Sequence, residues 1–386
     1  MLRKLKNNFE DMDKILLIIM FFLSIFGLFN IVSASSREAV VGMDKSVYFY
    51  FYRHLIILIG GLIAFIVISC VETKHYYRIV PPLFCAFVFL NVFVIVNGTF
   101  TRGAMNWIPL GFFNLQPSEV AKPIIIAALA LLVERYGKRV RSPKTKHWNL
   151  IWIFCGIGLI IPALVFMQKD LGTTIIQLAI FGVIYLLSPI LPKEKWKIIG
   201  GLGALLVVFL LAVYAYKGEV LSQKQMDRFN YFNPCSKYAG TGYQVCNAYI
   251  AINLGGLNGV GIGKSTQKYS YIPEAHTDMV FAIFAEEYGC LAGLFLLLLY
   301  AIILWRILML SSRASTIRGK YMCLGVAVYI FAHIFINLGG MFGIIPLTGV
   351  PLPFLSYGGS FTLSLIASLG IVQRVHIETK RYKLKF

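Results

Sequence analysis

The chain has 386 residues, of which 58% are hydrophobic and only 14% are charged. Soluble globular domains carry about 25% charged residues, so this composition excludes a large soluble enzyme and indicates an integral membrane protein. The net charge of +19 would also suit a nucleic-acid-binding protein. The distribution of the charges along the chain decides between these two classes.

Ten apolar runs approach or exceed the roughly 18 residues that a membrane-spanning helix needs. They cover residues 15–35, 54–71, 79–97, 118–134, 148–167, 171–189, 196–216, 278–305, 321–345 and 357–373. Only helices and closed barrels satisfy the backbone in lipid, and runs of this length favour helices. The sequence therefore predicts an all-α, polytopic protein with about ten transmembrane helices, forming one membrane domain over residues 1–386.

The basic residues gather on one side of the predicted membrane. If the N-terminus is cytoplasmic, 24 of the 36 Lys and Arg residues lie in the inner segments and 11 in the outer loops. Positive charge on the cytoplasmic side is the general rule for membrane proteins. The charge therefore predicts a multi-pass protein of the cytoplasmic membrane with both termini inside, and no nucleic-acid partner.

Residues 217–277 form one large predicted extracytoplasmic loop between the seventh and eighth spans. A loop of this length is usually functional or disordered. Its glycine-rich stretch at 255–265 does not meet the P-loop pattern, because Asn258 stands where a glycine is required. Cys235 and Cys246 both lie in this loop, and the spacing leaves open whether they form a disulfide.

Carboxylates are almost excluded from the predicted spans, so the few that occur there are candidates for function. Asp278 lies at the mouth of the eighth span, and Glu286 and Glu287 lie two to three turns further in. Adjacent helix positions point about 100° apart, so we expect only one of these two glutamates, Glu286, to face a cavity. For Asp278 the alternative is a helix N-cap.

Two further outer segments are rich in polar, Gly and Pro residues. Residues 98–117 lead into the fourth span, where Glu119 and Lys122 lie three positions apart and share a helix face. This pair could act in function, or neutralise its own charge, or both. Residues 338–360 contain three prolines, and such broken backbone is tolerated at membrane depth where it lines a cavity. We expect the three outer segments to converge on one cavity.

Five motifs, in order along the whole chain, resemble the SEDS family, which includes RodA, FtsW and SpoVE. They are QPSEVAK at 116–122, QKDLGTT at 168–174, GYQ at 242–244 with GGLNGVGIGKS at 255–265, IPEAHTDMVFAIFAEEYG at 272–289, and PLTGVPLPFLSYGGS at 346–360. The resemblance implies a ten-span peptidoglycan glycosyltransferase that polymerises lipid II into glycan strands during division or elongation. It also implies a class B penicillin-binding protein as partner, together with other divisome or elongasome proteins.

The same resemblance implies roles for single residues. Asp278 matches the family's essential aspartate, and Glu119 and Lys122 match the acid and base of its span-4 motif. The reaction joins a sugar hydroxyl to an anomeric carbon while a polyprenyl diphosphate leaves. A carboxylate near the hydroxyl should accept its proton, so Asp278 is the predicted catalytic general base.

The leaving diphosphate requires cations or oriented N–H donors. A divalent cation, Mg²⁺ or Mn²⁺, would serve as well, although no ligand cluster in the sequence requires one and we predict no protein metal site. The predicted substrate-binding residues are Glu119, Lys122, Arg228, Gln244, Lys264, His276, Thr277, Glu286, Ser356, Tyr357, Gly358 and Gly359.

Other interpretations stay open at this point. His276 and the SYGGS stretch could serve loop structure alone, and His333 and Asn337 could be interhelical hydrogen-bond partners. The whole protein could be a lipid II flippase, or a noncatalytic scaffold for the crosslinking partner. The motifs leave the branch of the family open, with the longer segment at 259–278 favouring the FtsW type.

Overall fold

The computed structural model describes residues 2–101, 104–109, 114–140, 148–217, 234–237, 242–270, 272 and 275–384. Within this part, ten long helices coincide with the ten predicted runs, so the all-α prediction is confirmed. They are α2 (Lys14–Arg37), α3 (Phe49–Cys70), α4 (Tyr76–Asn97), α5 (Pro117–Val140), α6 (Trp148–Met167), α7 (Leu171–Leu187), α8 (Pro192–Lys217), α12 (Val280–Arg313), α13 (Ile317–Met341) and α14 (Gly359–Lys383). Among the described helices, six are long and apolar enough to cross a membrane, and α6 and α7 contain shorter apolar segments.

Short elements connect the spans. The helical ones are α1 (Leu2–Glu10), the π-helix Glu38–Gly42, the 3₁₀ turns Thr73–His75 and Pro234–Lys237, α10 (Tyr243–Gly255) and α11 (Gln267–Ser270). A small antiparallel sheet, in the order β1 (Thr99–Thr101), β2 (Ala104–Pro109), β3 (Asn114–Leu115), precedes α5. The polar sequence at 98–117 predicts a loop, so the sheet differs from the prediction.

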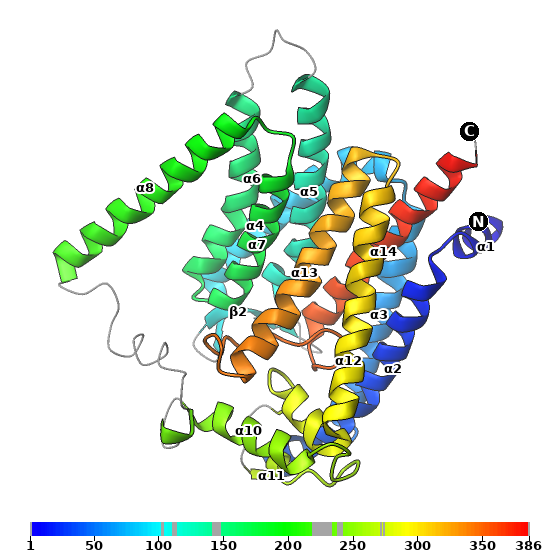
Figure 1. Cartoon of the computed structure of the whole chain (residues 1–386), viewed down its shortest axis with the longest axis vertical. Coiled ribbons are helices and arrows are strands. Elements are labelled where there is room, and N and C mark those ends of the chain that lie inside the picture. Colours follow the sequence, from blue (N-terminus) through cyan, green and yellow to red (C-terminus); the bar gives the residue numbers. More distant parts are fainter. Residues whose placement is uncertain are drawn as a thin grey trace.

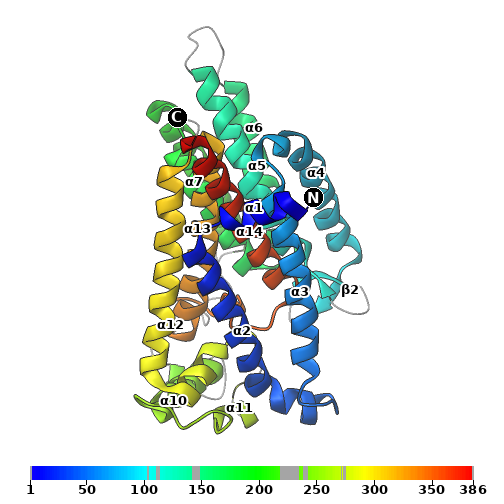
Figure 2. The ribbon, with the colours of Figure 1, turned by 90° about the vertical axis from the view of Figure 1, so that its right-hand side faces the viewer.

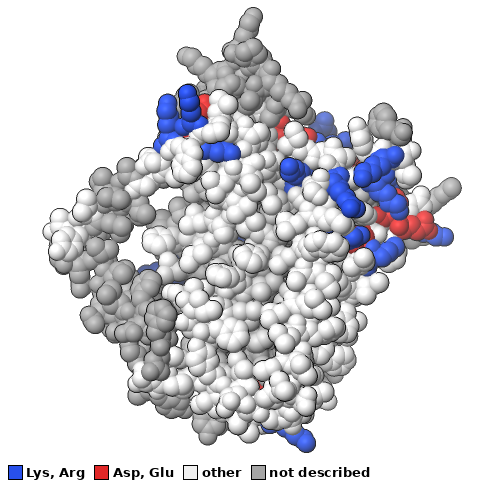
Figure 3. Space-filling model, in the orientation of Figure 1, with Lys and Arg blue, Asp and Glu red and all other residues white. Residues whose placement is uncertain are grey.

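The spans run side by side in one bundle, with α10 and α11 lying across one end and the two chain termini toward the other (Figures 1 and 2). Helix α8 leans away from the bundle at the left of Figure 1. In the face that Figure 3 shows, most Lys and Arg side chains gather toward the end of the molecule with the termini, and the belt below is nearly free of charge. This separation matches the predicted clustering of positive charge on one side of the membrane.

The first and last helices are joined at the end of the molecule that carries the termini. Asp13 caps α2 by accepting from Leu16 N at 2.9 Å, and its other oxygen pairs with Arg306 of α12 at 2.6 Å. Asp11 pairs with Lys380 at 2.9 Å and with Arg381 at 2.8 Å. Burial alone would raise the pKa of Asp11, but the hydrogen bonds and charges of these two cations outweigh it and hold the pKa below its usual value.

Helix α12 is broken near the end that lies away from the chain termini, which is the predicted outer end, by the backbone of the preceding loop. Gly289 has φ +85° and ψ 169°, which is not helical. The loop crosses at this break, where Val260 N donates to Glu286 O at 2.9 Å and Cys290 N donates to Gly256 O at 2.9 Å. The loop thus replaces helical hydrogen bonds that the break removes, as broken membrane helices require. The segment Val280–Tyr288 is consequently a separate short helical piece that follows Asp278.

The backbone conformation and close packing at position 289 require glycine, which a substitution can test. A Cβ atom at Gly289 would lie 2.3 Å from Leu257 O and 2.4 Å from Gly259 N, and positive φ adds strain of about 1–3 kcal/mol for other residues. We expect Gly289→Ala to lower the thermal unfolding midpoint in detergent by several degrees. The control is Gly182→Ala in α7, where a Cβ meets nothing within 4 Å, and which should leave the midpoint unchanged or slightly raised. Equal midpoints for both variants would contradict the interlocked break.

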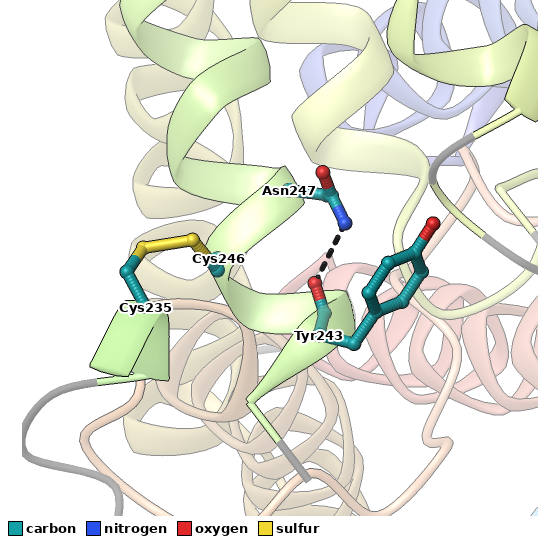
Figure 4. Close-up of a disulfide and its surroundings, with 4 residues drawn as sticks. All are labelled: Cys235, Tyr243, Cys246 and Asn247. Carbon is teal, nitrogen blue, oxygen red and sulfur yellow. Dashed lines mark hydrogen bonds between the residues drawn. A yellow bond between two sulfur atoms is a disulfide. The ribbon is translucent and has the colours of Figure 1, made fainter. Parts of the chain in front are cut away.

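The outer loop contains a disulfide between Cys235 and Cys246, a pairing that the sequence left open. The two Cα atoms lie 4.9 Å apart and the sulfur atoms are bonded (Figure 4). The bond attaches the 3₁₀ turn Pro234–Lys237 to the first turns of α10, where Asn247 Nδ2 also donates to Tyr243 O at 2.9 Å. This end of the loop is therefore tied to α10 by a covalent bond.

Candidate active site

Asp278 lies at the outer end of α12, directly before the helix begins. The helix N-cap is Met279, and no side chain caps it, so the alternative of Asp278 as the N-cap is wrong. The Asp278 side chain is only partly buried, and Thr277 Oγ1 lies 3.2 Å from Asp278 Oδ1 in a hydrogen bond. The carboxylate of Asp278 therefore lies at the mouth of the span, partly exposed, and does not cap the helix.

The segment 342–358 passes beside this carboxylate in a broken, non-helical path. Gly349 has φ +68°, and a Cβ atom there would lie 3.8 Å from Asp278 Oδ2. Side chains from two helices hold the segment. Asn337 of α13 donates to Val350 O at 2.7 Å, and the hydroxyl of Tyr300 of α12 donates to Pro353 O. The expected approach of broken backbone to the eighth span is thus seen at Asp278.

Glu119 and Lys122 form a fully buried ion pair on α5. The Nζ atom lies 2.6 Å from Glu119 Oε1, and both side chains are at most 4% exposed. Lys122 Nζ also lies 3.0 Å from Nε2 of His333. Since an ammonium can only donate, Nε2 accepts and the His333 ring carries its proton on Nδ1, which lies 3.1 Å from Pro351 O. The pair therefore reaches the broken segment through His333, the interhelical partner that the sequence predicted.

Asp170 connects the same pair to the small sheet. Its Oδ1 accepts from Thr173 N at 3.0 Å and caps α7, while Oδ2 accepts from Asn106 of β2 at 2.9 Å and from Gln116 at 2.8 Å. The Thr173 hydroxyl in turn lies 3.4 Å from Glu119 Oε1. The role of Asn106 was not predicted, because no sequence pattern indicates a strand there.

The two glutamates of α12 bind the outer loop. Glu286 is fully buried and accepts from Ser265 Oγ, from Thr266 N at 2.7 Å and from Thr266 Oγ1 at 3.0 Å. Glu287 pairs with Lys268 at 2.8 Å and accepts from Ser33 Oγ of α2 at 2.6 Å. The prediction that Glu286 faces a cavity does not fit this arrangement, because both of its oxygens are occupied by loop donors.

His276 and Tyr357 belong to an aromatic cluster at the outer ends of α2 and α3. The ring centroid of His276 lies 4.5 Å from Tyr50 and 5.6 Å from Tyr357. Tyr357 N donates to His276 O at 2.8 Å, which joins the SYGGS stretch to the HTD motif. His276 Nδ1 lies 3.1 Å from Glu38 Oε2, although the pair does not have hydrogen-bond geometry. His276 therefore holds these two motifs together.

The remaining predicted site residues are more scattered. Ser356 is buried and accepts from Leu352 N at 2.7 Å, and Gly358 is the N-cap of α14, of which Gly359 is the first residue. Lys264 is exposed on the outer loop, and Gln244 is partly buried on α10. Arg228 lies outside the described residues. The structure thus gathers Asp278, Thr277, His276 and Tyr357, with the Glu119–Lys122 pair behind the broken segment.

A mutation series separates the structural contribution of the Glu119–Lys122 pair from any other role. Lys122→Met leaves Glu119 buried without its cation, and breaking a buried pair in this way costs about 3–5 kcal/mol. We expect the thermal midpoint in detergent to fall markedly, and Glu119→Gln combined with Lys122→Met to recover part of that loss. Lys74→Met is the control, since the Lys74–Glu72 pair is largely exposed and should matter by less than about 1 kcal/mol. If Lys122→Met were as stable as Lys74→Met, another group would have to stabilise the buried carboxylate of Glu119.

Anchoring of the outer loop by Glu286 is tested by proteolysis. Glu286→Ala removes the acceptor for Ser265 and Thr266, so we expect trypsin to cleave after the neighbouring Lys264 at least several-fold faster in folded protein. Asp44→Ala, at an exposed outer position, should leave the cleavage rate unchanged. Equal rates for the two variants would mean that other contacts hold the loop.

Comparison with known proteins decides the family. Residues 13–381 match the profile of the FtsW/RodA/SpoVE family, which is described as cell cycle protein. The chain belongs to this family. The match to the FtsW/RodA/SpoVE family covers nearly the whole length of the chain, so the resemblance seen in the five motifs is confirmed.

Curated members of the FtsW/RodA/SpoVE family align with almost the entire chain. The probable peptidoglycan glycosyltransferase FtsW of Bacillus subtilis is 32% identical over 97% of this chain and 93% of its own. The peptidoglycan glycosyltransferase MrdB of Escherichia coli K12 is 33% identical over 97% of both chains. The stage V sporulation protein E of Bacillus subtilis is 32% identical over 94% of this chain and 96% of its own.

Solved structures agree on the fold. A chain from a study described as the structural coordination of polymerization and crosslinking by a peptidoglycan synthase complex has a TM-score of 0.73 and 25% identity. It covers 95% of this chain and 97% of its own. The rod shape determining protein RodA of Thermus thermophilus has a TM-score of 0.67 at 24% identity and covers 95% of this chain and 96% of its own.

Proposed function

We propose that this protein is a peptidoglycan glycosyltransferase that polymerises lipid II at the outer face of the bacterial cytoplasmic membrane. The observation that carries the proposal is the place of Asp278, at the outer mouth of α12 beside the Gly349 turn, in a chain with full-length glycosyltransferase relatives. A partly exposed carboxylate at the membrane surface suits a substrate with a lipid tail and a polar head. The sugars would then meet Asp278 while the polyprenyl chain stays in the bilayer.

Asp278 acts as the general base in the proposed reaction. The hydroxyl of the acceptor sugar attacks the anomeric carbon of the donor, and the bond from that carbon to the diphosphate oxygen breaks. Asp278 accepts the hydroxyl proton as the new carbon–oxygen bond forms, so no positive charge builds up on the attacking oxygen. A diphosphate leaves without an acid catalyst, because its negative charge is already stable, so one carboxylate suffices.

The diphosphate needs a positive or donor-rich environment. Lys264 is exposed on the outer loop, and the first N–H groups of α14, at Gly359 and beyond, lie in the described SYGGS stretch. Lys122 is engaged with Glu119 and His333, so its charge acts from behind the broken segment. Within the described residues no group of three or more His, Cys, Asp or Glu side chains could hold a metal ion. If a Mg²⁺ or Mn²⁺ ion takes part, Asp278 is the residue that would hold it, and the ion would supply positive charge to the leaving diphosphate.

A crosslinking partner follows from the chemistry and from one neighbour. The structure with the higher similarity comes from a complex that couples polymerization to crosslinking. We infer that this chain likewise acts with a class B penicillin-binding protein, with its basic end and both termini in the cytoplasm.

A lipid II flippase receives less support, since Glu119, Lys122 and Asp170 are bound to protein groups and do not line an open path.

The proposal is tested by lipid II polymerisation with purified protein, alone and with its cognate transpeptidase. We expect glycan strands from the wild type and a loss of at least about 10²-fold in rate for Asp278→Asn, as general-base removal predicts. Asp44→Asn is the matched control: it makes the same change at an exposed outer position with φ +52°, a conformation that asparagine adopts readily.

Retained polymerisation by Asp278→Asn would exclude the general-base role. If neither wild type nor variant makes strands with partner and divalent cations present, the glycosyltransferase proposal itself fails. Transport or scaffolding would then be the better interpretation.

A further inference from the structure

Asn337 of α13 bridges two backbone segments that meet at the candidate site. Its Nδ2 atom lies 2.7 Å from the carbonyl oxygen of Asp278 and 2.7 Å from that of Val350. The residue is only 2% exposed, and its Oδ1 atom has no hydrogen-bond partner among the described residues. The two hydrogens of this buried amide group are therefore bound to the two backbone segments that flank the Asp278 carboxylate.

The orientation of the amide follows from its partners. Two carbonyl oxygens face the same atom, and carbonyls accept hydrogen bonds only, so this atom is the nitrogen. An amide NH₂ has two hydrogens, which matches the two acceptors. The substitution of a carboxylate or an apolar side chain would remove the donor that the two carbonyls share at a buried position.

The bridge determines where the Asp278 carboxylate lies. The residue sits between the loop that carries Thr277 and the first residue of α12, and it is not itself the helix cap. The Val350 end of the bridge follows Gly349, whose backbone faces Asp278 Oδ2. Asn337 thereby sets the distance between the carboxylate and the broken segment, and one turn below it His333 binds Pro351 O of the same segment.

We propose that Asn337 is the positioning residue of the catalytic carboxylate, which it holds against the Val350 turn through the Asp278 carbonyl. It does not contact substrate in this role. The inference rests on the proposed function, in which Asp278 is the general base. Small displacements of a reacting group are enough to matter, because about 1 Å of misplacement can reduce the rate by about 10²-fold.

The test combines kinetics with hydrogen–deuterium exchange on full-length protein in detergent. We expect Asn337→Asp and Asn337→Ala to lower the kcat of lipid II polymerisation by about 10- to 100-fold, with KM changed by less than about twofold. We also expect faster exchange in two places, the start of α12 around Ala282 N and the turn around Ser356 N, which are both protected by backbone bonds in the native structure.

Asn91→Asp and Asn91→Ala are the matched controls. Asn91 is likewise a buried asparagine in a span, on α4, and its Nδ2 donates to Phe87 O at 2.7 Å. These variants likewise remove a buried amide together with its hydrogen bonds, to Phe87 O and from Gln168 Nε2, yet they should leave kcat and exchange at the two segments within twofold of wild type.

The exchange measurement keeps the positioning claim separate from the proposed function, because it needs no enzymatic activity. Faster exchange at both segments in the Asn337 variants alone, with a kcat-specific loss, supports the proposal. Unchanged exchange overturns it, whether or not the wild type polymerises lipid II. If the wild type polymerises and the Asn337 variants match the Asn91 controls in kcat, the proposal is also overturned, although the glycosyltransferase function stands.

Discussion

The requirement that every polar group inside the membrane find a partner within the protein shapes the outer third of this molecule. Two stretches there leave regular helix, at the Gly289 break and at 342–358, and the carbonyls and amides that they release cannot be hydrated by lipid. At the first break, loop backbone supplies the hydrogen-bond partners. At the second, the side chains of Asn337, His333 and Tyr300 supply them. The candidate site lies at the second stretch, where the Gly349 turn is beside Asp278.

Buried acidic side chains also need partners within the protein, and this need separates the acids into two groups. Glu119, Glu286 and Glu287 are each enclosed by donors or a cation, so their negative charge is neutralised where it lies. Asp278 differs because it is partly exposed. A carboxylate that is to exchange a proton with a substrate has to keep access to it, whereas an enclosed carboxylate serves as an anchor. Burial thus separates the proposed general base, Asp278, from the acids that build its surroundings.

The sequence predicted the elements whose signal is local. The ten spans follow from hydropathy alone, and the Glu119–Lys122 pair follows from a three-residue helical spacing. It did not place Glu286, because the donors that enclose it come from a loop some twenty residues earlier and only folding brings them together. The short strands near Asn106 were missed for the opposite reason: two to six residues carry too little periodicity to recognise. The roles of Asn337 and His276 required the three-dimensional arrangement.

The ion pairs that join the termini carry a consequence for biogenesis. Asp13, buried at the start of the first span, finds its cation in α12, and Asp11 finds its cations at the end of α14. Arg306 follows Asp13 by 293 residues and Arg381 follows Asp11 by 370, so the ribosome makes these partners long after the acids. The native ion pairs of Asp13 and Asp11 can therefore form only late in synthesis, and those of Asp11 only after α14 has been made. Truncation of the C-terminal helix would release the N-terminus as well as the end that was removed.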